Sequence, residues 1–254
     1  MVIYEIKNME ILGIDIGGSG MKGAIVNTVT GELKTERFRI PTPKSKKPEK
    51  MAKVFKEIVE HFNYSGPVGC GFPSIVKHGV CKAQGNLDKS WLDINIETLF
   101  SDASGQKVTV INDADAAGYA VMKYGIGKNK SGLVVIITIG TGLGSGVFYN
   151  SKLIPNFELG QIPYKKYKKI EHWASNFSKE RDNLSYKKWG KRFNTFLSLV
   201  EVIVCPDYII LGGGVSKDFE QFKDCITIET PVQPAQLGNY AGIIGAACSV
   251  LEKS

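Results

Sequence analysis

Residues 14–27 read IDIGGSGMKGAIVN, and residues 137–150, 123 positions further on, read ITIGTGLGSGVFYN. The two stretches align without a gap, with identical pairs at Ile14/Ile137, Ile16/Ile139, Gly17/Gly140, Gly23/Gly146 and Asn27/Asn150. Each has an apolar run, a glycine-rich turn and a second apolar run, a pattern typical of a β-hairpin. We therefore predict an internal repeat in which both halves of the molecule begin with the same hairpin. The alternative is a chance similarity between two glycine-rich turns.

Strand and helix patterns alternate outward from these hairpins. Helices that follow strands are typical of an α/β fold, and the two antiparallel hairpins favour a mixed sheet over a purely parallel one. Strands are predicted at 11–17, 22–28, 33–40, 67–71, 107–111, 133–139, 144–149 and 207–211, and helices at 48–63, 113–124, 166–178, 185–204, 216–222 and 240–252.

Two similar halves predict two lobes, each built on a mixed sheet, with a cleft between them. The N-terminal lobe is expected at residues 1–112 and the C-terminal lobe at 113–237, because the chain passes from strand to helix at 112–113. Residues 238–254 are expected to form a C-terminal helix that returns to the N-terminal lobe.

The composition is that of a folded globular protein, with 43% hydrophobic and 22% charged residues among 254. It excludes disordered, collagen-like and coiled-coil chains. No apolar run reaches the roughly 18 residues that a membrane helix needs, and residues 1–5 lack the pattern of a signal peptide. The five cysteines form no C-x-x-C pair, so neither a disulfide framework nor a zinc site is indicated, and the expected compartment is the cytoplasm.

The formal charge of +7 is concentrated in one segment. Between Tyr164 and Arg192 ten basic residues stand against three acidic ones, a balance of +7, while the rest of the chain carries 22 residues of each sign. A local excess of positive charge indicates an anionic partner, such as a nucleic acid, a membrane surface or a polyanionic substrate. The alternative is a solvated helical face.

The first glycine turn is a candidate phosphate and metal site. Glycines at a hairpin tip let the backbone N–H groups of Gly17, Gly18 and Ser19 turn together toward an anion. Asp15 ends a buried strand, where it can hold Mg²⁺ through water beside a phosphate, and Lys22 can offset phosphate charge. Because glycine-rich hairpins without ligands are common, this turn alone is a weak indication.

The second glycine turn repeats this arrangement with Thr141 and Gly142, and the Ser145 hydroxyl is added to it. Two such turns at equivalent points of two lobes could hold one polyphosphate from both sides. A third glycine cluster, with Gly213 and Gly214, follows the last predicted strand. Without side chains, these glycines would let a flat nucleotide approach the backbone. The alternative is a tight turn from the strand into a helix.

Asn112 and Asp113 lie where a predicted strand gives way to a helix. A carboxylate there can accept a proton from a substrate hydroxyl while the neighbouring amide donates to the same substrate. Asp115 fits better as an acidic residue near the start of the helix, where its negative charge interacts favourably with the helix dipole. Asp113 is therefore the candidate general base.

The motifs DIGGSGMKGA, GFPS, NLDKSW, NDADAAG, TIGTGLGSGVF, ELGQ and LGGGVS, in this order, resemble those of the ROK sugar kinases. The resemblance covers residues 11 to about 248. Three of the motifs, GGSGMKG, NLDKSW and NDADAAG, are most similar to the polyphosphate glucokinase branch, which lacks the zinc-binding cysteine cluster of other members. The resemblance implies an actin/hexokinase-like (ribonuclease H-like) fold, a homodimer, and phosphorylation of glucose at its 6-hydroxyl with Mg²⁺ and polyphosphate and/or ATP.

The resemblance also implies a role for each motif. Asp113 is expected to be the catalytic base, and the phosphate and metal residues are those of the two turns. Sugar contacts are expected from Asn86, Asn112, Glu158 and Gln161, and a wall of the sugar pocket is expected from Gly71, Phe72, Pro73 and Ser74. Phosphate or nucleotide contacts are expected from Asp15, Gly17, Gly18, Ser19, Lys22, Thr141, Gly142, Gly213 and Gly214. A polyphosphate track is expected from Lys165, Lys166, Lys168 and Lys169.

One position departs from the family pattern. Members usually carry His after E-x-G, and this chain carries Gln161, which hydrogen-bonds but cannot become cationic. The alternative function is therefore a sugar sensor, or a kinase for another hexose, on the same fold. Trp91 is expected either against a sugar face or in the core.

Nucleic acid and membrane are not expected as partners. Repressors that resemble this family carry a helix-turn-helix unit before the first strand, and only ten residues precede Ile11. The basic segment contains no recognised nucleic-acid motif. Polyphosphate is the anion that best suits it.

Overall fold

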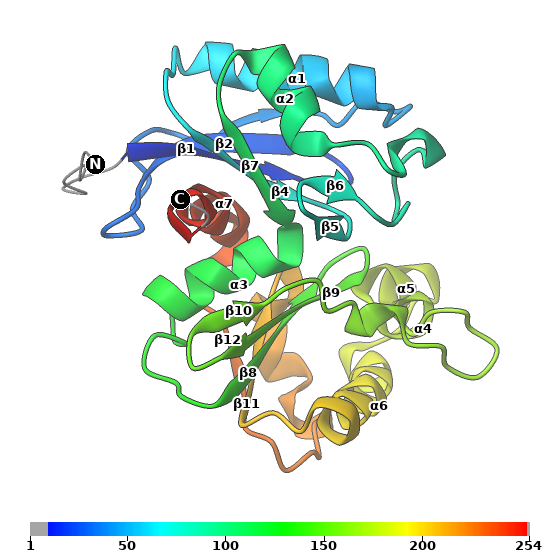
Figure 1. The fold of residues 1–254 in the computed structure, drawn as a ribbon. Coiled ribbons are helices and arrows are strands. Elements are labelled where there is room, and N and C mark those ends of the chain that lie inside the picture. The colour runs from blue at the N-terminus through cyan, green and yellow to red at the C-terminus, as the bar shows by residue number, and fades with distance from the viewer. Residues whose placement is uncertain (1–9, 253–254) are drawn as a thin grey trace. The chain divides into compact units, whose positions relative to one another are not determined.

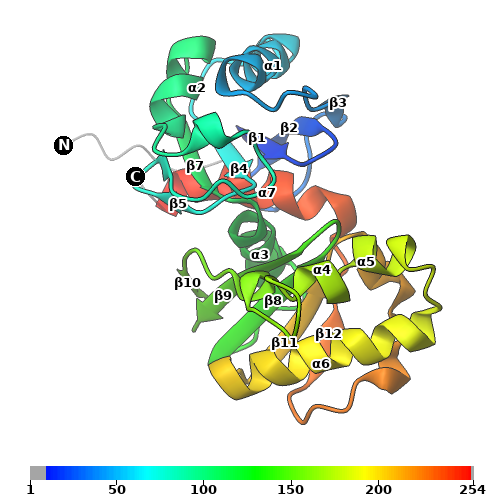
Figure 2. The ribbon, with the colours of Figure 1, turned by 90° about the vertical axis from the view of Figure 1, so that its right-hand side faces the viewer.

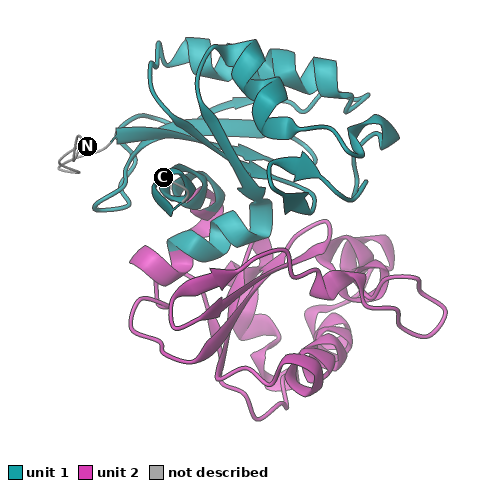
Figure 3. Ribbon diagram, in the orientation of Figure 1, with its two compact units in different colours: residues 1–120, 242–254 teal, residues 121–241 magenta. Residues whose placement is uncertain are grey.

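The computed structural model describes residues 10–252. The chain divides into two compact units (Figure 3): one holds the chain up to Ala120 and from Gly242 on, and the other holds Val121–Ala241. The divisions fall a few residues after the predicted boundaries at 112–113 and 237–238, because helices α3 (Asp113–Tyr124) and α7 (Ala241–Glu252) each contribute residues to both units.

The first unit is built on a five-stranded sheet of order β3-β2-β1-β4-β7. Antiparallel pairing joins β1, β2 and β3, and parallel pairing joins β1 to β4 and β4 to β7, so the sheet is mixed, as predicted. The strands are β1 (Glu10–Ile16), β2 (Met21–Asn27), β3 (Phe38–Ile40), β4 (Val68–Phe72) and β7 (Val108–Asn112), with a small ribbon of β5 (Val76–Lys77) and β6 (Val80–Cys81) beside them.

The second unit repeats this plan in a sheet of order β10-β9-β8-β11-β12. Its first three strands are again antiparallel and its last two parallel. The strands are β8 (Leu133–Ile139), β9 (Leu143–Tyr149), β10 (Lys152–Ile154), β11 (Tyr208–Gly212) and β12 (Val232–Pro234). The identical strand order and direction confirm the internal repeat.

The ungapped alignment of the two hairpins is wrong in its second strand. Ile14 pairs with Gly23 in the first hairpin, but Ile137 pairs with Ser145, not Gly146, in the second. Four residues separate β1 from β2, and three separate β8 from β9. Since a shift of one residue turns a side chain to the other face of a sheet, two of the five identical pairs do not occupy equivalent places.

Helices of the first unit cover both faces of its sheet (Figure 1). Helices α1 (Pro48–His61) and α2 (Ile96–Ser104) enclose a core with Phe55, Phe72 and Phe100, whose rings stack or meet edge to face. Helix α7 lies on the opposite face. Trp91, in the short 3₁₀ helix η1 (Lys89–Trp91), is fully buried against Phe72, so it is a core residue and not a sugar platform.

Glycines allow α7 to pack unusually close to the sheet. A methyl group on Gly13 would overlap the carbonyl of Ile243, and one on Gly69 would overlap the carbonyl of Ala246. Gly13 and Gly69 are paired neighbours on β1 and β4. This close fit fixes α7 in the first unit, where the sequence places the returning C-terminal helix.

Helices α4, α5 and α6 of the second unit lie on one face of its sheet, and α6 is the longest of them (Figure 2). Phe193, Phe196 and Leu197 of α6 are fully buried against Val135 and Ile137 of β8. The helical elements are α4 (Glu171–Ala174), α5 (Asn176–Arg181) and α6 (Tyr186–Val204), with 3₁₀ turns η2 (Leu159–Gln161), η3 (Gly214–Gln221), η4 (Lys223–Cys225) and η5 (Gly238–Tyr240).

The helices differ from the predictions in three places. The segment predicted as a helix at 216–222 lies mostly in the 3₁₀ helix η3. The helix predicted at 166–178 is instead a tight turn bridged by Tyr164 and Tyr167, followed by α4 and α5, because Ser175 caps a new helix there. Helix α2 is not predicted from the sequence, although Asn95 caps its start and Gly105, with φ of 69°, ends it.

None of the helices within residues 10–252 is long and apolar enough to span a membrane. Within the same range, no three His, Cys, Asp or Glu side chains gather as a set of metal ligands.

Candidate active site

Three parallel-running strands of the first unit end at one edge of its sheet, and the predicted residues lie there. Asp15 of β1 pairs with Gly71 of β4, and Phe72 of β4 pairs with Asn112 of β7. Because the carboxyl ends of parallel strands share an edge, residues from three distant parts of the sequence come together. The predictions of a pocket wall at 71–73, a base at 113 and a metal ligand at 15 therefore fall in one region.

Asn112 holds the start of α3 and thereby fixes Asp113. Its Oδ1 accepts hydrogen bonds from the backbone N–H groups of Ala114 (2.8 Å) and Asp115 (3.1 Å), and its Nδ2 donates to the carbonyl of Ser74 (3.1 Å). The Asn112 side chain is buried, whereas Asp113 remains partly exposed. Asn112 is thus a helix cap that positions Asp113, a contribution that the sequence did not indicate.

The carboxylate of Asp15 lies next to a cation and against a glycine. Lys22 Nζ donates to Asp15 Oδ2 at 2.9 Å across the β1–β2 hairpin. A methyl group on Gly242 of α7 would lie 2.7 Å from Asp15 Cγ, so only glycine leaves room for this carboxylate. The sequence did not indicate a role for Gly242, which is revealed by this close contact with the Asp15 carboxylate.

The first glycine turn is braced from the neighbouring strand. Arg39 Nη2 donates to the carbonyl of Ser19 (2.8 Å), and Thr42 Oγ1 donates to that of Gly17 (2.6 Å). Gly18 and Ser19 are exposed at the tip, where their backbone can meet an anion. Since Arg39 pairs with Lys22 across β2 and β3, two cations flank this turn, and Arg39 was missed by the sequence reasoning.

The other predicted sugar residues of the first unit differ in how exposed they are. Phe72 is fully buried in the core, and Pro73 is partly exposed. Asn86 is exposed in a loop, where its carbonyl accepts a hydrogen bond from Lys46 Nζ (2.9 Å). The Asn86 side chain is therefore available to a ligand, while Phe72 shapes the wall from behind.

In the second unit, the E-x-G motif packs on the second glycine turn. A methyl group on Gly160 would overlap the carbonyl of Leu143, the residue that follows the turn. The Ser145 hydroxyl donates to the carbonyl of Phe157 (2.6 Å) and accepts from the N–H of Leu159 (3.0 Å). Ser145 is thus a buried support for the motif and not part of the anion turn, because its hydroxyl is used within the fold.

Glu171 links the sugar motif to the second glycine turn. Its Oε1 accepts from Gln161 Nε2 (3.1 Å) and lies 3.7 Å from Lys169 Nζ, while its Oε2 accepts from the backbone N–H of Leu143 (3.2 Å). The residue is buried. Sequence reasoning counted Glu171 only among the acidic residues of the basic segment, because nothing in the spacing indicates that the chain returns to the turn.

Glu158 is a carboxyl group with an altered proton affinity. Burial, together with the negative charge of Glu171, raises its pKa to about 7, and Lys169 opposes this shift. Glu158 is therefore partly protonated at neutral pH. Such a group can both donate to and accept from a hydroxylated ligand.

Gly213 brings the third glycine cluster to the second turn. Its φ is 80°, and a methyl group there would lie 2.7 Å from the N–H nitrogen of Ile139, the last residue before the turn. Gly214 has open space around its Cα, and Thr141 at the turn tip is exposed. The second unit thus gathers Thr141, Gly142, Gln161 and Gly213 around the ends of β8 and β11.

The family model of the ROK family matches residues 11–156, which is more than half of the chain. This protein belongs to the ROK family. The polyphosphate glucokinase of Mycobacterium tuberculosis (strain CDC 1551 / Oshkosh) is 44% identical over 236 residues, 92% of this chain and 89% of the relative. That of Mycobacterium leprae (strain TN) is 42% identical over 236 residues, 92% of this chain and 72% of the relative.

A solved structure of a ROK relative has the same fold throughout. The inorganic polyphosphate/ATP-glucomannokinase from Arthrobacter sp. strain KM matches with a TM-score of 0.93 at 40% identity, over 97% of this chain and 100% of that chain. The match confirms the actin/hexokinase-like fold that the motifs predicted for this ROK protein.

Proposed function

We propose that the protein is a glucokinase that transfers a phosphoryl group from inorganic polyphosphate and/or ATP to the 6-hydroxyl of glucose. The observation that carries this proposal is the edge of the first sheet. Asp113 directly follows β7, the first glycine turn directly follows β1, and both strands end at this edge on either side of β4. The similarity to relatives named polyphosphate glucokinase and polyphosphate/ATP-glucomannokinase supports the choice of substrates.

Asp113 is the proposed general base. As the 6-hydroxyl oxygen of glucose forms its bond to phosphorus, the bond from phosphorus to the leaving phosphate oxygen breaks, and the hydroxyl proton passes to the Asp113 carboxylate. The Asn112 cap holds this carboxylate at the start of α3, so little reorientation is needed during the reaction. Asn86, Glu158 and Gln161 are proposed to bind the other hydroxyls.

The two glycine turns are proposed to bind the donor phosphates. Gly17, Gly18 and Ser19 offer backbone N–H groups, and Lys22 and Arg39 offset negative charge there. Thr141 and Gly142 do the same in the second unit, and Gly213 and Gly214 would face a nucleoside.

Asp15 fits a Mg²⁺ ion that keeps most of its water. It is a partly exposed carboxylate beside a phosphate turn, and Mg²⁺ commonly uses one or two carboxylates together with substrate phosphates. When bound, the ion would neutralise charge on the donor. Asp15 would hold its water ligands, and Lys22 keeps the carboxylate oriented.

The polyphosphate track is proposed at the turn 164–169. Lys165 and Lys166 occupy its tip, and Lys168 follows. Lys169 contributes less than expected, because its ammonium group lies 3.7 Å from Glu171. The homodimer and the cleft between the lobes stay predictions.

A donor assay tests this function. Glucose phosphorylation is measured with polyphosphate and with ATP, each at low and high salt. We expect activity with polyphosphate whose KM rises severalfold with salt, because contacts between exposed charges are screened. Activity with ATP alone, at any salt, would exclude polyphosphate as donor, and no activity with any hexose would favour the sensor.

Glucose binding is expected to release protons from this protein. Hydroxyl groups that donate to Glu158 favour its charged form, so binding lowers its pKa from about 7 and releases a fraction of a proton at pH 7. Affinity for glucose therefore rises as pH increases through about 7. Calorimetry in buffers of different ionisation enthalpy measures the release. Glu158→Gln should abolish it and Glu229→Gln, an exposed control, should not; equal release in both variants would refute this role.

A further inference from the structure

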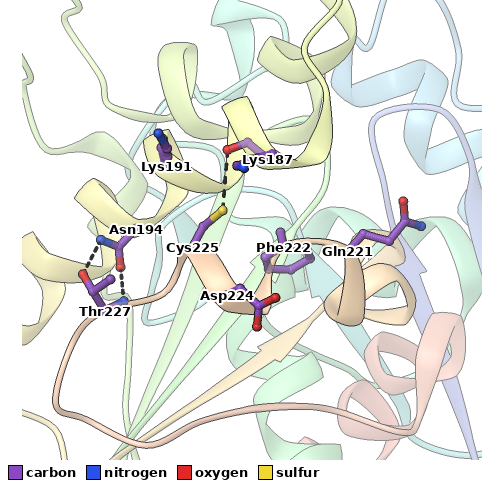
Figure 4. A pocket seen from close by; sticks show the side chains of 8 residues that line it. All are labelled: Lys187, Lys191, Asn194, Gln221, Phe222, Asp224, Cys225 and Thr227. Carbon is purple, nitrogen blue, oxygen red and sulfur yellow. Dashed lines mark hydrogen bonds between the residues drawn. The ribbon is translucent and has the colours of Figure 1, made fainter.

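A cavity of about 530 Å³ lies in the second unit, between α6 and the segment 221–227 (Figure 4). Its size is within the range of small-molecule sites. None of its lining residues belongs to a glycine turn or to the E-x-G motif, so the proposed sugar and phosphate residues do not account for it.

Hydrogen bonds join the two walls of this cavity at two places. Cys225 Sγ donates to the carbonyl of Lys187 (3.5 Å). Asn194 bonds Thr227 twice, with its Nδ2 donating to Thr227 Oγ1 (2.9 Å) and its Oδ1 accepting from the Thr227 N–H (2.8 Å). Figure 4 shows these bonds between residues that line the cavity. The cavity is thus a fixed part of the fold, and not a gap between loosely placed segments.

The cavity is electropositive. Lys187 and Lys191 lie one helical turn apart on the same side of α6. Both are exposed, and among residues 10–252 neither forms an ion pair with a carboxylate. Asp224 is the single carboxylate that lines the cavity. Two ammonium groups beside the Asn194 amide suit an anion with more than one charge, such as a phosphate.

The same region of α6 adjoins the proposed polyphosphate track. The ring of Trp173 lies 5.8 Å from Lys165 Nζ of the track and 5.5 Å from Arg192 Cζ of α6, and Tyr164 packs on it at 4.6 Å. Arg192 is the residue next to Lys191. Trp173 thus joins the turn 164–169 to α6, where Arg192 is paired with Asp182 at 2.6 Å and the exposed Lys187, Lys188 and Lys191 add further positive charge. Two basic elements in contact favour an extended anion over a compact one.

We propose that this cavity binds a distal part of the polyphosphate chain, several phosphates away from the one that is transferred. This proposal rests on the proposed function and adds a preference for long chains. A chain that reaches both the second glycine turn and the cavity, which belong to the same unit, gains contacts that ATP or tripolyphosphate does not make. Dissociation after each transfer is slower when such remote contacts persist.

The test is the double charge reversal Lys187→Glu/Lys191→Glu, with the double neutral variant Lys187→Met/Lys191→Met. The matched control is Lys50→Glu/Lys53→Glu, which makes the same change in net charge at exposed positions of α1 in the other unit. Glucose phosphorylation is measured with long-chain polyphosphate, tripolyphosphate and ATP, and binding of long-chain polyphosphate is measured by calorimetry.

We expect the reversal to raise the KM for long-chain polyphosphate about tenfold and the neutral variant to raise it less, because repulsion is added only in the first. The KM values for tripolyphosphate, ATP and glucose should stay within about twofold of those of the parent protein. The control should leave the KM values for all four compounds unchanged. An equal rise in the KM for tripolyphosphate would overturn the proposal. A rise in the KM for ATP alone would also overturn it and would assign the cavity to a nucleotide.

The two proposals fail in different ways. If the parent protein does not phosphorylate glucose with polyphosphate, the proposed donor is wrong, and calorimetry still decides the cavity. Equal binding of long-chain polyphosphate by the parent protein and by the reversal would overturn the cavity proposal alone.

Discussion

Replacement of Asp113 by Asn is expected to lower kcat for glucose phosphorylation about 10²- to 10⁴-fold, the usual contribution of a general base. The amide cannot take the proton of the 6-hydroxyl. Its oxygen can still accept the hydrogen bond from Ala114 that Asp113 Oδ1 accepts at 2.9 Å, and the Asn112 cap is unchanged. The variant should therefore fold and bind glucose with an affinity within a few-fold of the parent.

Steady-state kinetics and glucose titration measure the two effects separately. The control is Asp102→Asn, which removes an exposed carboxylate from α2 of the same unit and should leave kcat unchanged. Full activity of Asp113→Asn would eliminate this residue as the base, and a parallel loss of glucose affinity would indicate that it mainly binds sugar.

Replacement of Gly160 by Ala is expected to reduce kcat/KM for glucose about 100-fold, the cost of a displacement of about 1 Å in a reacting group. The new methyl group would overlap the Leu143 carbonyl, so η2 must move away from the second glycine turn. Gln161 lies in η2 and Glu158 directly precedes it, and both would shift. Overpacking should also cost about 1–3 kcal/mol of stability.

Gly212→Ala is the matched control for this variant. A methyl group there would meet Thr138 Cγ2 at 3.7 Å, an ordinary contact. Kinetics with glucose and thermal unfolding of both variants separate displacement from a general loss of stability. Normal kinetics in a folded Gly160→Ala protein would show that the E-x-G motif does not place sugar ligands through this contact.

The sequence indicated the fold through features that depend on neighbours along the chain. Alternating apolar runs and glycine turns gave the two hairpins and the mixed sheets, which the structure confirms. The one-residue difference between the two turns was not visible, because glycine at 23 and at 146 permits an ungapped alignment that hydrogen-bond register does not follow. Helix α2 could not be recognised, because its nine residues contain only two buried apolar positions, Ile96 and Phe100, too few to establish a helical period.

Site residues could be predicted from the sequence where the side chain has a recognisable chemical role and lies within a local sequence motif. Asp15 and Asp113 are examples, and β-strand pairing places them at one edge. Glu171 and Gly242 could not be found in this way, since each acts through a contact with a distant part of the chain. The capping role of Asn112 was missed for a different reason: the same amide suits a ligand or a helix start.

The return of α7 to the first unit sets an order of events during synthesis. The ribosome completes Val121–Ala241 before it makes the helix that covers Gly13 and Gly69. Until then, the β1–β4 surface of a nascent first unit is open to water and to other chains. The first unit therefore keeps this surface uncovered until the final turns of α7 are made, which leaves it open to aggregation during synthesis.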